Sequence, residues 1–220
     1  MELQYLGHAG FRISQGALEI LIDPYLSRDS RREDMPKTGP EVDPRMLRPS
    51  HILLTHEHFD HCDVPVVTML AKRHSAKVIG PPPVDRKLGF NVIKVRPGNS
   101  LDFDGFKLRV IKAFHHQSEF PVGFLIEIGE LRIYHAGDTY YDSGLGRINT
   151  DIALLPIGGT YTMDIDEAVK LANEIHPQIA VPMHFNTFGN IKADPAEFCR
   201  KLEGVCKCAV MKPGEVMKLG

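Results

Sequence analysis

Short apolar runs separated by polar turns recur along the first two thirds of the chain. The first runs are ELQYL, GFRIS and ALEILID, at residues 2–6, 10–14 and 17–23. Alternating or short apolar runs bounded by Gly and Pro are typical of β-strands. The same pattern predicts later strands at 51–55, 76–80, 91–95, 106–114, 122–128 and 131–136.

An aspartate suited to the N-cap position opens each of three helical patterns. The predicted helices span 63–74, 164–175 and 194–204. Glu167, three residues after Asp164, completes a capping box, and Pro195 suits the first turn of its helix. Strands of the last third are predicted at 151–157, 178–183, 208–211 and 215–219. A β-rich start and a β–α finish predict two sheets packed together with helices outside them.

A polar, Pro-rich segment from Tyr25 to Ser50 has little periodicity and predicts a long surface loop. Loops of this length in compact domains are often lids or binding loops. Its arginines would attract an anionic substrate, but acidic residues stand among them. The charged residues concerned are Arg28, Asp29, Arg31, Arg32, Glu33 and Asp34. Because the two signs are mixed, a solvated surface is the favoured interpretation.

The composition is that of a globular protein, and its net charge does not indicate a strongly charged binding partner. Its 220 residues, 43% hydrophobic and 25% charged, suit one domain, or two fused halves that share a core of sizeable extent. The formal net charge of −2 gives no electrostatic reason to bind nucleic acid or an anionic membrane. No apolar run approaches the roughly 20 residues of a membrane span, and the N-terminus does not resemble a signal peptide. We therefore expect a cytoplasmic protein, and leave open whether it forms a homo-oligomer.

The four cysteines are too few for a disulfide framework in a chain of this length. They are Cys62, Cys199, Cys206 and Cys208. The Cys206-x-Cys208 spacing permits metal binding, but no second Cys or His pair lies near it in the sequence. We expect four reduced cysteines that serve as small core or surface residues.

The candidate chemistry lies in the histidines. Eleven are present, and three of them stand with an aspartate in LLTHEHFDH, residues 53–61. Groups of His or Asp follow four predicted strands: His56, His58, Asp60 and His61, then His115 and His116, then Asp138, then His184. Strands fix where such side chains start and loops aim them, so the pattern predicts a site at one sheet edge. Neutral imidazole and carboxylate suit zinc, iron or manganese.

THEHFDH matches the H-x-H-x-D-H signature of the metallo-β-lactamase superfamily, and AFH, YHAGDT and VPMHF follow it in the same order as in that family. The chain resembles this superfamily over essentially its whole length. The loop LLPIGGTYTMDIDEA is similar to a subgroup of small metal-dependent hydrolases akin to the L-ascorbate-6-phosphate lactonase type. The resemblance implies an α/β (α+β) fold, a four-layer αββα sandwich with its site at one edge of the two sheets, in a single hydrolase domain over 1–220.

The resemblance also implies two divalent metal ions, with zinc favoured and manganese or iron as alternatives. It assigns His56, His58 and His115 to a first ion, Asp60, His61 and His184 to a second, and Asp138 to a bridging position. The spacing agrees, because side chains at i and i+2 of an extended segment face one side, as His56 and His58 would. Glu57 and Phe59 would then point away. Gly137 would allow a close backbone approach just before Asp138.

This arrangement implies a hydrolytic reaction. Two divalent ions roughly 3.5–4 Å apart can share a water and lower its pKa from about 15.7 toward about 7. The dinuclear metal-bound hydroxide would cleave a small ester, lactone or phosphoester substrate, and Asp60 would hydrogen-bond it and accept a proton. Insertions and extra domains of nuclease, thiolesterase and flavoprotein relatives are missing, which favours a small-molecule substrate over nucleic acid. The alternatives are a non-catalytic metal- or ligand-binding module and a phosphodiesterase acting on nucleotides or nucleic acid.

Several residues near the predicted ligands have two interpretations. His8, in the turn GHAG, is expected near the metals without binding one, or else as a hydrogen-bonded scaffold histidine. Asp23 is expected to shape a turn or to support a ligand from behind. His116 is the alternative to His115 as a ligand, and otherwise faces substrate or solvent. Thr139 follows the predicted bridging aspartate and would orient it.

Gly159 and Thr160 belong to a loop, 158–163, between a predicted strand and a capped helix. Its backbone N–H groups would face a substrate oxyanion or phosphate, or the loop is an ordinary β–α connection. His135 is expected to pack within the scaffold. The remaining histidines singled out here are expected to be surface or capping residues: His51, His74 and His176.

Overall fold

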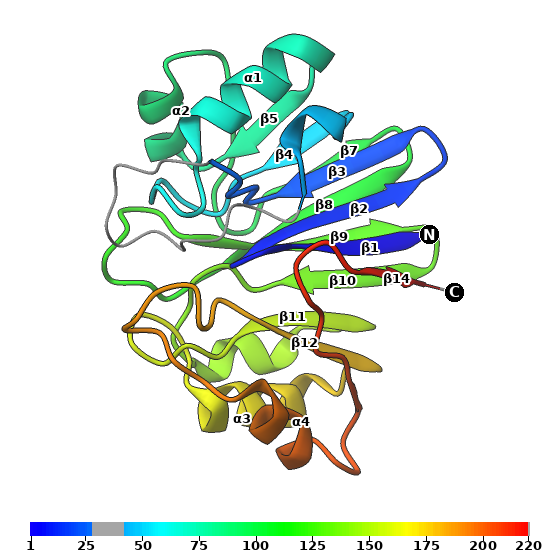
Figure 1. Ribbon diagram of the computed structural model, residues 1–220, viewed down its shortest axis with the longest axis vertical. Coiled ribbons are helices and arrows are strands. Elements are labelled where there is room, and N and C mark those ends of the chain that lie inside the picture. Colours follow the sequence, from blue (N-terminus) through cyan, green and yellow to red (C-terminus); the bar gives the residue numbers. More distant parts are fainter. Residues whose placement is uncertain (28–41, 220) are drawn as a thin grey trace. The chain divides into compact units, whose positions relative to one another are not determined.

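The computed structural model describes residues 1–27 and 42–219 (Figure 1). The chain divides into two compact units, the first comprising Met1–Val95 and Met211–Gly220 and the second Arg96–Val210. Each unit contains one sheet, and each is described by itself. That the two units act as a single domain over 1–220 stays a prediction.

The first unit is built on a seven-stranded sheet in the order β14-β1-β2-β3-β4-β5-β6. Its strands are β1 (Glu2–Gly7), β2 (Gly10–Gln15), β3 (Leu18–Ile22), β4 (His51–Leu53), β5 (Lys77–Gly80), β6 (Ile93–Lys94) and β14 (Val216–Lys218). Neighbours from β14 to β3 are antiparallel, and those from β3 to β6 are parallel. The sequence placed all seven strands, with ends that differ by a few residues.

Two helices, α1 (Val64–His74) and α2 (Pro82–Leu88), lie beside β4 and β5 in the first unit (Figure 1). As predicted, Asp63 caps α1, its side chain accepting from the Val66 N–H. Buried residues of both helices share one apolar cluster with Ile52 of β4 and Val78 of β5. The sequence did not predict α2, because Pro81 stands at its N-cap and offers no side-chain oxygen.

The second unit also has a seven-stranded sheet, in the order β13-β12-β11-β10-β9-β8-β7. Its strands are β7 (Ser100–Phe103), β8 (Phe106–Lys112), β9 (Val122–Ile128), β10 (Leu131–His135), β11 (Ile152–Pro156), β12 (Ile179–Met183) and β13 (Lys207–Cys208). The antiparallel part runs from β7 to β10 and the parallel part from β10 to β13. The edge strand β7 was not predicted.

Two helices, α3 (Ile165–Ile175) and α4 (Pro195–Lys201), complete the second unit. The predicted capping box of α3 is confirmed, since Asp164 accepts from Glu167 N at 2.9 Å and Glu167 accepts from Asp164 N at 3.2 Å. Short 3-10 turns occur in both units, as η1 (Pro44–Met46) and η2 (Ser143–Arg147). None of the described helices is long and apolar enough to cross a membrane.

The expectation of four reduced cysteines is wrong. Cys199 and Cys208 form a disulfide with their Cα atoms 5.2 Å apart, which joins α4 to the edge strand β13. The turn after α4 returns the chain to the sheet, and this places the two residues side by side despite a separation of nine positions. Cys62 and Cys206 are free. Burial raises the pKa of the Cys62 thiol to about 12.

The three histidines expected at the surface or at caps differ in their outcome. His51 is buried on β4, where its Nδ1 lies 2.9 Å from Ser50 Oγ, so the surface prediction is wrong for it. His176 ends α3 in the left-handed conformation, with a φ of 44°, and is the expected cap. His74 lies in the last turn of α1. Residues 28–41 of the predicted long loop, including its six singled-out charged residues, lie outside the described part of the chain.

Asp151 connects three neighbouring strands of the second unit. Its carboxylate accepts from Arg132 N, Nε and Nη2 at 2.8, 3.1 and 3.0 Å, and from Gln178 Nε2 at 3.2 Å. Its main-chain oxygen accepts from the N–H groups of Gln178 and Ile179. The hydrogen bonds from Arg132 hold the pKa of Asp151 below its ordinary value. The charged carboxylate therefore stabilises the start of β11.

Replacing this carboxylate should destabilise the fold in a pH-dependent way. We expect Asp151→Asn to lower the free energy of unfolding by about 1.5–3 kcal/mol at pH 7. Because the folded pKa is depressed, this contribution is present above the ordinary value of about 3.9 and is lost as the pH falls through the folded pKa. Urea unfolding at pH 7 and pH 3 should show the difference shrinking. Asp102→Asn is the control, since Asp102 is exposed and pairs loosely with Lys107 at 4.0 Å.

Candidate metal centre

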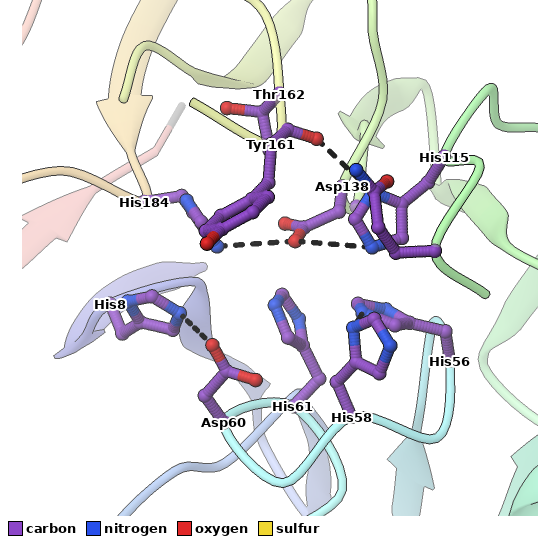
Figure 2. A network of polar contacts seen from close by, with 12 residues as sticks. His8, His56, His58, Asp60, His61, His115, Asp138, Tyr161, Thr162 and His184 are labelled. Carbon is purple, nitrogen blue, oxygen red and sulfur yellow. Dashed lines mark hydrogen bonds and ion pairs between the residues drawn. The ribbon is translucent and has the colours of Figure 1, made fainter. Parts of the chain in front are cut away.

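The segment after β4 brings two predicted ligands together. His56 and His58 face the same side, as their spacing predicts, and His56 Nε2 lies 3.0 Å from His58 Nδ1 (Figure 2). Directly after them the chain turns, with Cys62 N donating to His58 O at 2.7 Å. Donor atoms around a tetrahedral zinc ion lie roughly 3.3–3.8 Å apart. The two nitrogens are therefore close enough that the pair would be able to hold one divalent ion.

The same turn brings Asp60 and His61 close to His8. His8 Nε2 lies 3.1 Å from Asp60 Oδ2 (Figure 2). The possible donor atoms of His8, Asp60 and His61 all lie within 4.8 Å of one another. Nitrogen and carboxylate oxygen at such spacing also suit a divalent ion. The first unit thus holds two adjoining donor groups, and His8, in the turn between β1 and β2, contacts Asp60 of the second group.

Asp23, at the end of β3, supports this segment from behind. Its Oδ1 accepts from Thr55 N at 2.8 Å, and its Oδ2 lies 2.6 Å from Thr55 Oγ1 and 2.8 Å from His61 Nδ1. Thr55 Oγ1 in turn lies 3.0 Å from His56 Nδ1. Because Thr55 donates to Asp23, its hydroxyl oxygen is free to accept from His56. Both imidazoles are thereby held with Nδ1–H backward and Nε2 forward, the tautomer that a metal ligand needs.

Three of the described non-glycine residues in the first unit have a left-handed backbone: Ser75 ends α1, and the other two, His8 and Asp23, lie at the candidate site. His8 has a φ of 57° and Asp23 a φ of 43°, both in the left-handed region. Residues other than glycine in such regions cost of order 1 kcal/mol or more each and gather at functional sites. His184 of the second unit shares this feature, with a φ of 55°. The surrounding structure holds these side chains in place at the expense of stability.

The second unit gathers the other three predicted ligands. Asp138 follows β10, and Gly137 before it has a φ of 63° that lets the chain turn toward the site. Asp138 Oδ2 lies 3.1 Å from His184 Nε2 and 4.0 Å from His115 Nε2 (Figure 2). All three side chains are buried. A carboxylate close to two imidazole nitrogens is the arrangement expected of a shared metal ligand.

His115 is better placed as a ligand than its neighbour. It is buried, and its Nδ1 lies 3.1 Å from the main-chain oxygen of Tyr161, so that Nε2 faces Asp138. His116 is exposed and stacks on Tyr140 with ring centroids 5.5 Å apart. Of the two histidines, His115 is the one that faces Asp138, and its assignment as a metal ligand stays a prediction. The role of Tyr161 was not predicted, because a main-chain acceptor has no signature in the sequence.

Thr139 and the 158–163 loop hold the ligand-bearing segments together. Thr139 Oγ1 accepts from Phe114 N at 3.0 Å, and Thr139 O accepts from Met163 N at 2.9 Å. Thr139 thus joins two backbone segments, and its predicted role in orienting Asp138 stays a prediction. Gly158 was not singled out as a site residue, yet a Cβ there would collide with the main-chain oxygen of His184 and come within 3.1 Å of Ile191 Cβ.

Gly159 and Thr160 occupy the same loop. Gly159 has a φ of 80°, and its N–H donates to Met163 O at 3.1 Å. Thr160 Oγ1 donates to the main-chain oxygen of Asn190. These contacts tie the loop to the segment after His184. His135, as predicted, is packed in the scaffold, where its Nδ1 accepts from Gly137 N at 3.1 Å.

The comparisons with known proteins agree with this geometry. The family model described as "Beta-lactamase superfamily domain" matches residues 2–184. A UPF0173 metal-dependent hydrolase of Thermoplasma acidophilum is 37% identical over 226 residues, which cover 97% of this chain and 95% of that protein. One of Thermoplasma volcanium is 40% identical over 205 residues, covering 87% and 86%. The structure of Igni18, a metallo hydrolase from Ignicoccus hospitalis, superposes with a TM-score of 0.85 at 32% identity, covering 100% of this chain and 99% of that one.

The chain belongs to the metallo-β-lactamase superfamily and is a metal-dependent hydrolase. The predicted α/β fold of the metallo-β-lactamase type is confirmed, with two sheets and four α-helices in the described residues. The His and Asp groups of both units are able to bind metal. The assignment of each predicted ligand stays a prediction.

Weakening the support behind the ligands should weaken metal binding. We expect Asp23→Asn to lower metal affinity about 10–100-fold, because an amide cannot accept all three hydrogen bonds from Thr55 and His61. Competition with a chromogenic chelator measures this affinity. Asp85→Asn is the matched control, since Asp85 pairs with Lys94 on the surface of α2. Equal affinities in the two variants would show that Asp23 does not orient the ligands.

Proposed function

We propose that the seven predicted ligands hold two divalent metal ions and that the protein hydrolyses an ester, lactone or phosphoester bond in a small molecule. The first ion takes His56, His58 and His115, the second takes Asp60, His61 and His184, and Asp138 serves both. Zinc is the favoured metal, with manganese or iron as alternatives, because imidazole and carboxylate donors accept all three. A cytoplasmic location stays part of the proposal.

One observation carries this proposal. Three of the imidazoles, two in the segment after β4 and one after β8, each have Nδ1 close to an oxygen atom. His56 contacts Thr55 Oγ1, His61 contacts Asp23, and His115 contacts Tyr161 O, at 3.0, 2.8 and 3.1 Å. An oxygen acceptor behind Nδ1 is the usual support of a histidine that binds metal through Nε2.

The chemistry divides between the metals and the side chains. When bound, two divalent ions would lower the pKa of a water and polarise the oxygen of the attacked group. Asp60 is suited to accept a proton, because its carboxylate is partly exposed, at 15%, and is positioned by His8. His8 thereby acts on Asp60 and stays beside the predicted ligands without joining them.

The proposed substrate is small and needs no nucleic-acid surface, in keeping with a formal net charge of −2. The likeness of the segment LLPIGGTYTMDIDEA, residues 154–168, to hydrolases of the L-ascorbate-6-phosphate lactonase type stays a prediction. Purified protein loaded with zinc or manganese should be tested on p-nitrophenyl acetate, a γ-lactone and bis-p-nitrophenyl phosphate. Activity that disappears with a chelator and in His56→Ala supports the proposal. Metal-loaded protein that cleaves none of a broad panel would instead indicate a binding module.

Asp60 gives a sharper test of the proposed chemistry. We expect Asp60→Asn to lower kcat about 10²–10⁴-fold at saturating metal, because the amide cannot accept the proton. Metal content measured on the same sample shows whether binding is also lost. Glu57→Gln is the control, a carboxylate of the same segment that is predicted to point away. Full activity of metal-loaded Asp60→Asn would remove Asp60 from the reaction.

A further inference from the structure

Tyr161 is exposed although its loop is tightly held. Its side chain is 40% exposed, and it is the only aromatic among the large exposed apolar side chains of the described residues. Its main-chain oxygen accepts from His115 Nδ1. Core packing does not require an aromatic ring that is exposed on a constrained backbone. The direction in which the Tyr161 ring points therefore bears on its function.

The loop of Tyr161 is fixed against both histidine-bearing segments of the second unit. Gly158 contacts the backbone of His184 so closely that no side chain fits between them. Three positions further on, the Tyr161 carbonyl contacts the ring of His115. The direction of Tyr161 is thus set by the same contacts that set these two histidines. Figure 2 shows its ring extending from the loop toward the side of His184 and Asp138.

Asn190 fixes the phenol itself. Its Nδ2 donates to Tyr161 Oη at 3.2 Å, and Thr160 Oγ1 donates to its main-chain oxygen, so the two loops are joined at two points. In the Asn190 contact the phenol oxygen is the acceptor. The phenol proton therefore remains available to an acceptor supplied from outside the protein.

We propose that the Tyr161 hydroxyl donates a hydrogen bond to a substrate oxygen, a carbonyl or phosphoryl oxygen that gains negative charge during hydrolysis. Asn190 acts as a positioning residue that holds the phenol for this contact. The inference rests on the proposed hydrolase function and adds a substrate contact to it. Donors fixed in advance at such an oxygen stabilise the charge without reorganisation.

Anion binding tests this contact without any need for turnover. Methylphosphonate has charged oxygens like those of the proposed substrates, and its Kd for the zinc-loaded protein is measured by titration calorimetry. We expect Tyr161→Phe to raise this Kd about 10- to 100-fold, because a hydrogen bond to a charged oxygen is lost. The ring and the main-chain contact with His115 remain, so the zinc content should not change. Asn190→Ala should raise the Kd less, by roughly 3-fold.

Tyr141→Phe is the matched control. The hydroxyl of Tyr141 donates to Glu174 Oε1 at 2.6 Å, which raises its pKa to about 12 and commits its proton to α3. This variant should bind methylphosphonate as the unmodified protein does. For any substrate that is cleaved, kcat/KM should fall about 10²-fold in Tyr161→Phe and stay unchanged in Tyr141→Phe.

The outcomes separate this inference from the proposed function. Equal Kd values for Tyr161→Phe and the unmodified protein would overturn the inference, as would failure of the unmodified zinc protein to bind methylphosphonate. Absence of chelator-sensitive hydrolysis in the unmodified protein would count against the proposed function. The calorimetric result would still decide whether Tyr161 contacts an oxyanion.

Discussion

The candidate site depends first on one buried carboxylate. Asp23 has no exposed surface and accepts hydrogen bonds from the main chain and hydroxyl of Thr55 and from the ring of His61. Through Thr55 it also orients His56. A buried carboxylate without partners would be costly, so burial and hydrogen bonding here require each other. The rings of His56 and His61 are therefore oriented before metal binds, which lowers the conformational cost of metal binding.

The second unit reaches the same result by a different route. There the support behind His115 is a main-chain carbonyl, and the loop that carries it is held against His184 by the absence of a side chain at Gly158. His184 itself has a left-handed backbone, as Asp23 and His8 do in the first unit. The strand ends fix where the backbone of each predicted ligand lies. The left-handed backbone at His8, Asp23 and His184 and the close packing at Gly158 fix where the side chains point. The strained backbone lowers the stability of the fold at these few positions, but it holds the donor atoms in place for a metal.

Much of the fold could be predicted because its signals are local. The caps at Asp63 and Asp164 act within four residues, and the strands show short apolar runs. The helix α2 escaped prediction because Pro81 carries no capping oxygen. The disulfide of Cys199 could not be found, since Cys206 and Cys208 are equivalent partners until the turn after α4 is known.

The same division applies to the site. The spacing of His56 and His58 is local, and the order of the ligand groups follows a family pattern, so the sequence indicated both. The support from Tyr161 depends on a main-chain atom 46 positions from His115, which no residue type reveals. The support of His56 by Thr55 could more readily have been predicted, because this hydroxyl residue directly precedes His56 in the sequence. His51 was misplaced because a polar side chain gave no sign that β4 is buried at that position.

The central claim is that these histidines are held as metal ligands before metal binds. Long-range ¹H–¹⁵N correlation spectra of the imidazole rings test it most directly, recorded on metal-free and zinc-loaded protein. The account predicts Nδ1–H tautomers for His56, His61 and His115 in both states, with zinc shifting the Nε2 resonances. In the zinc-loaded protein His58, which presents Nδ1 to His56, should carry its proton on Nε2, whereas in the metal-free protein its Nδ1 should carry the proton that it donates to His56 Nε2. Nε2–H tautomers in His56, His61 and His115, unchanged by zinc, would contradict the account.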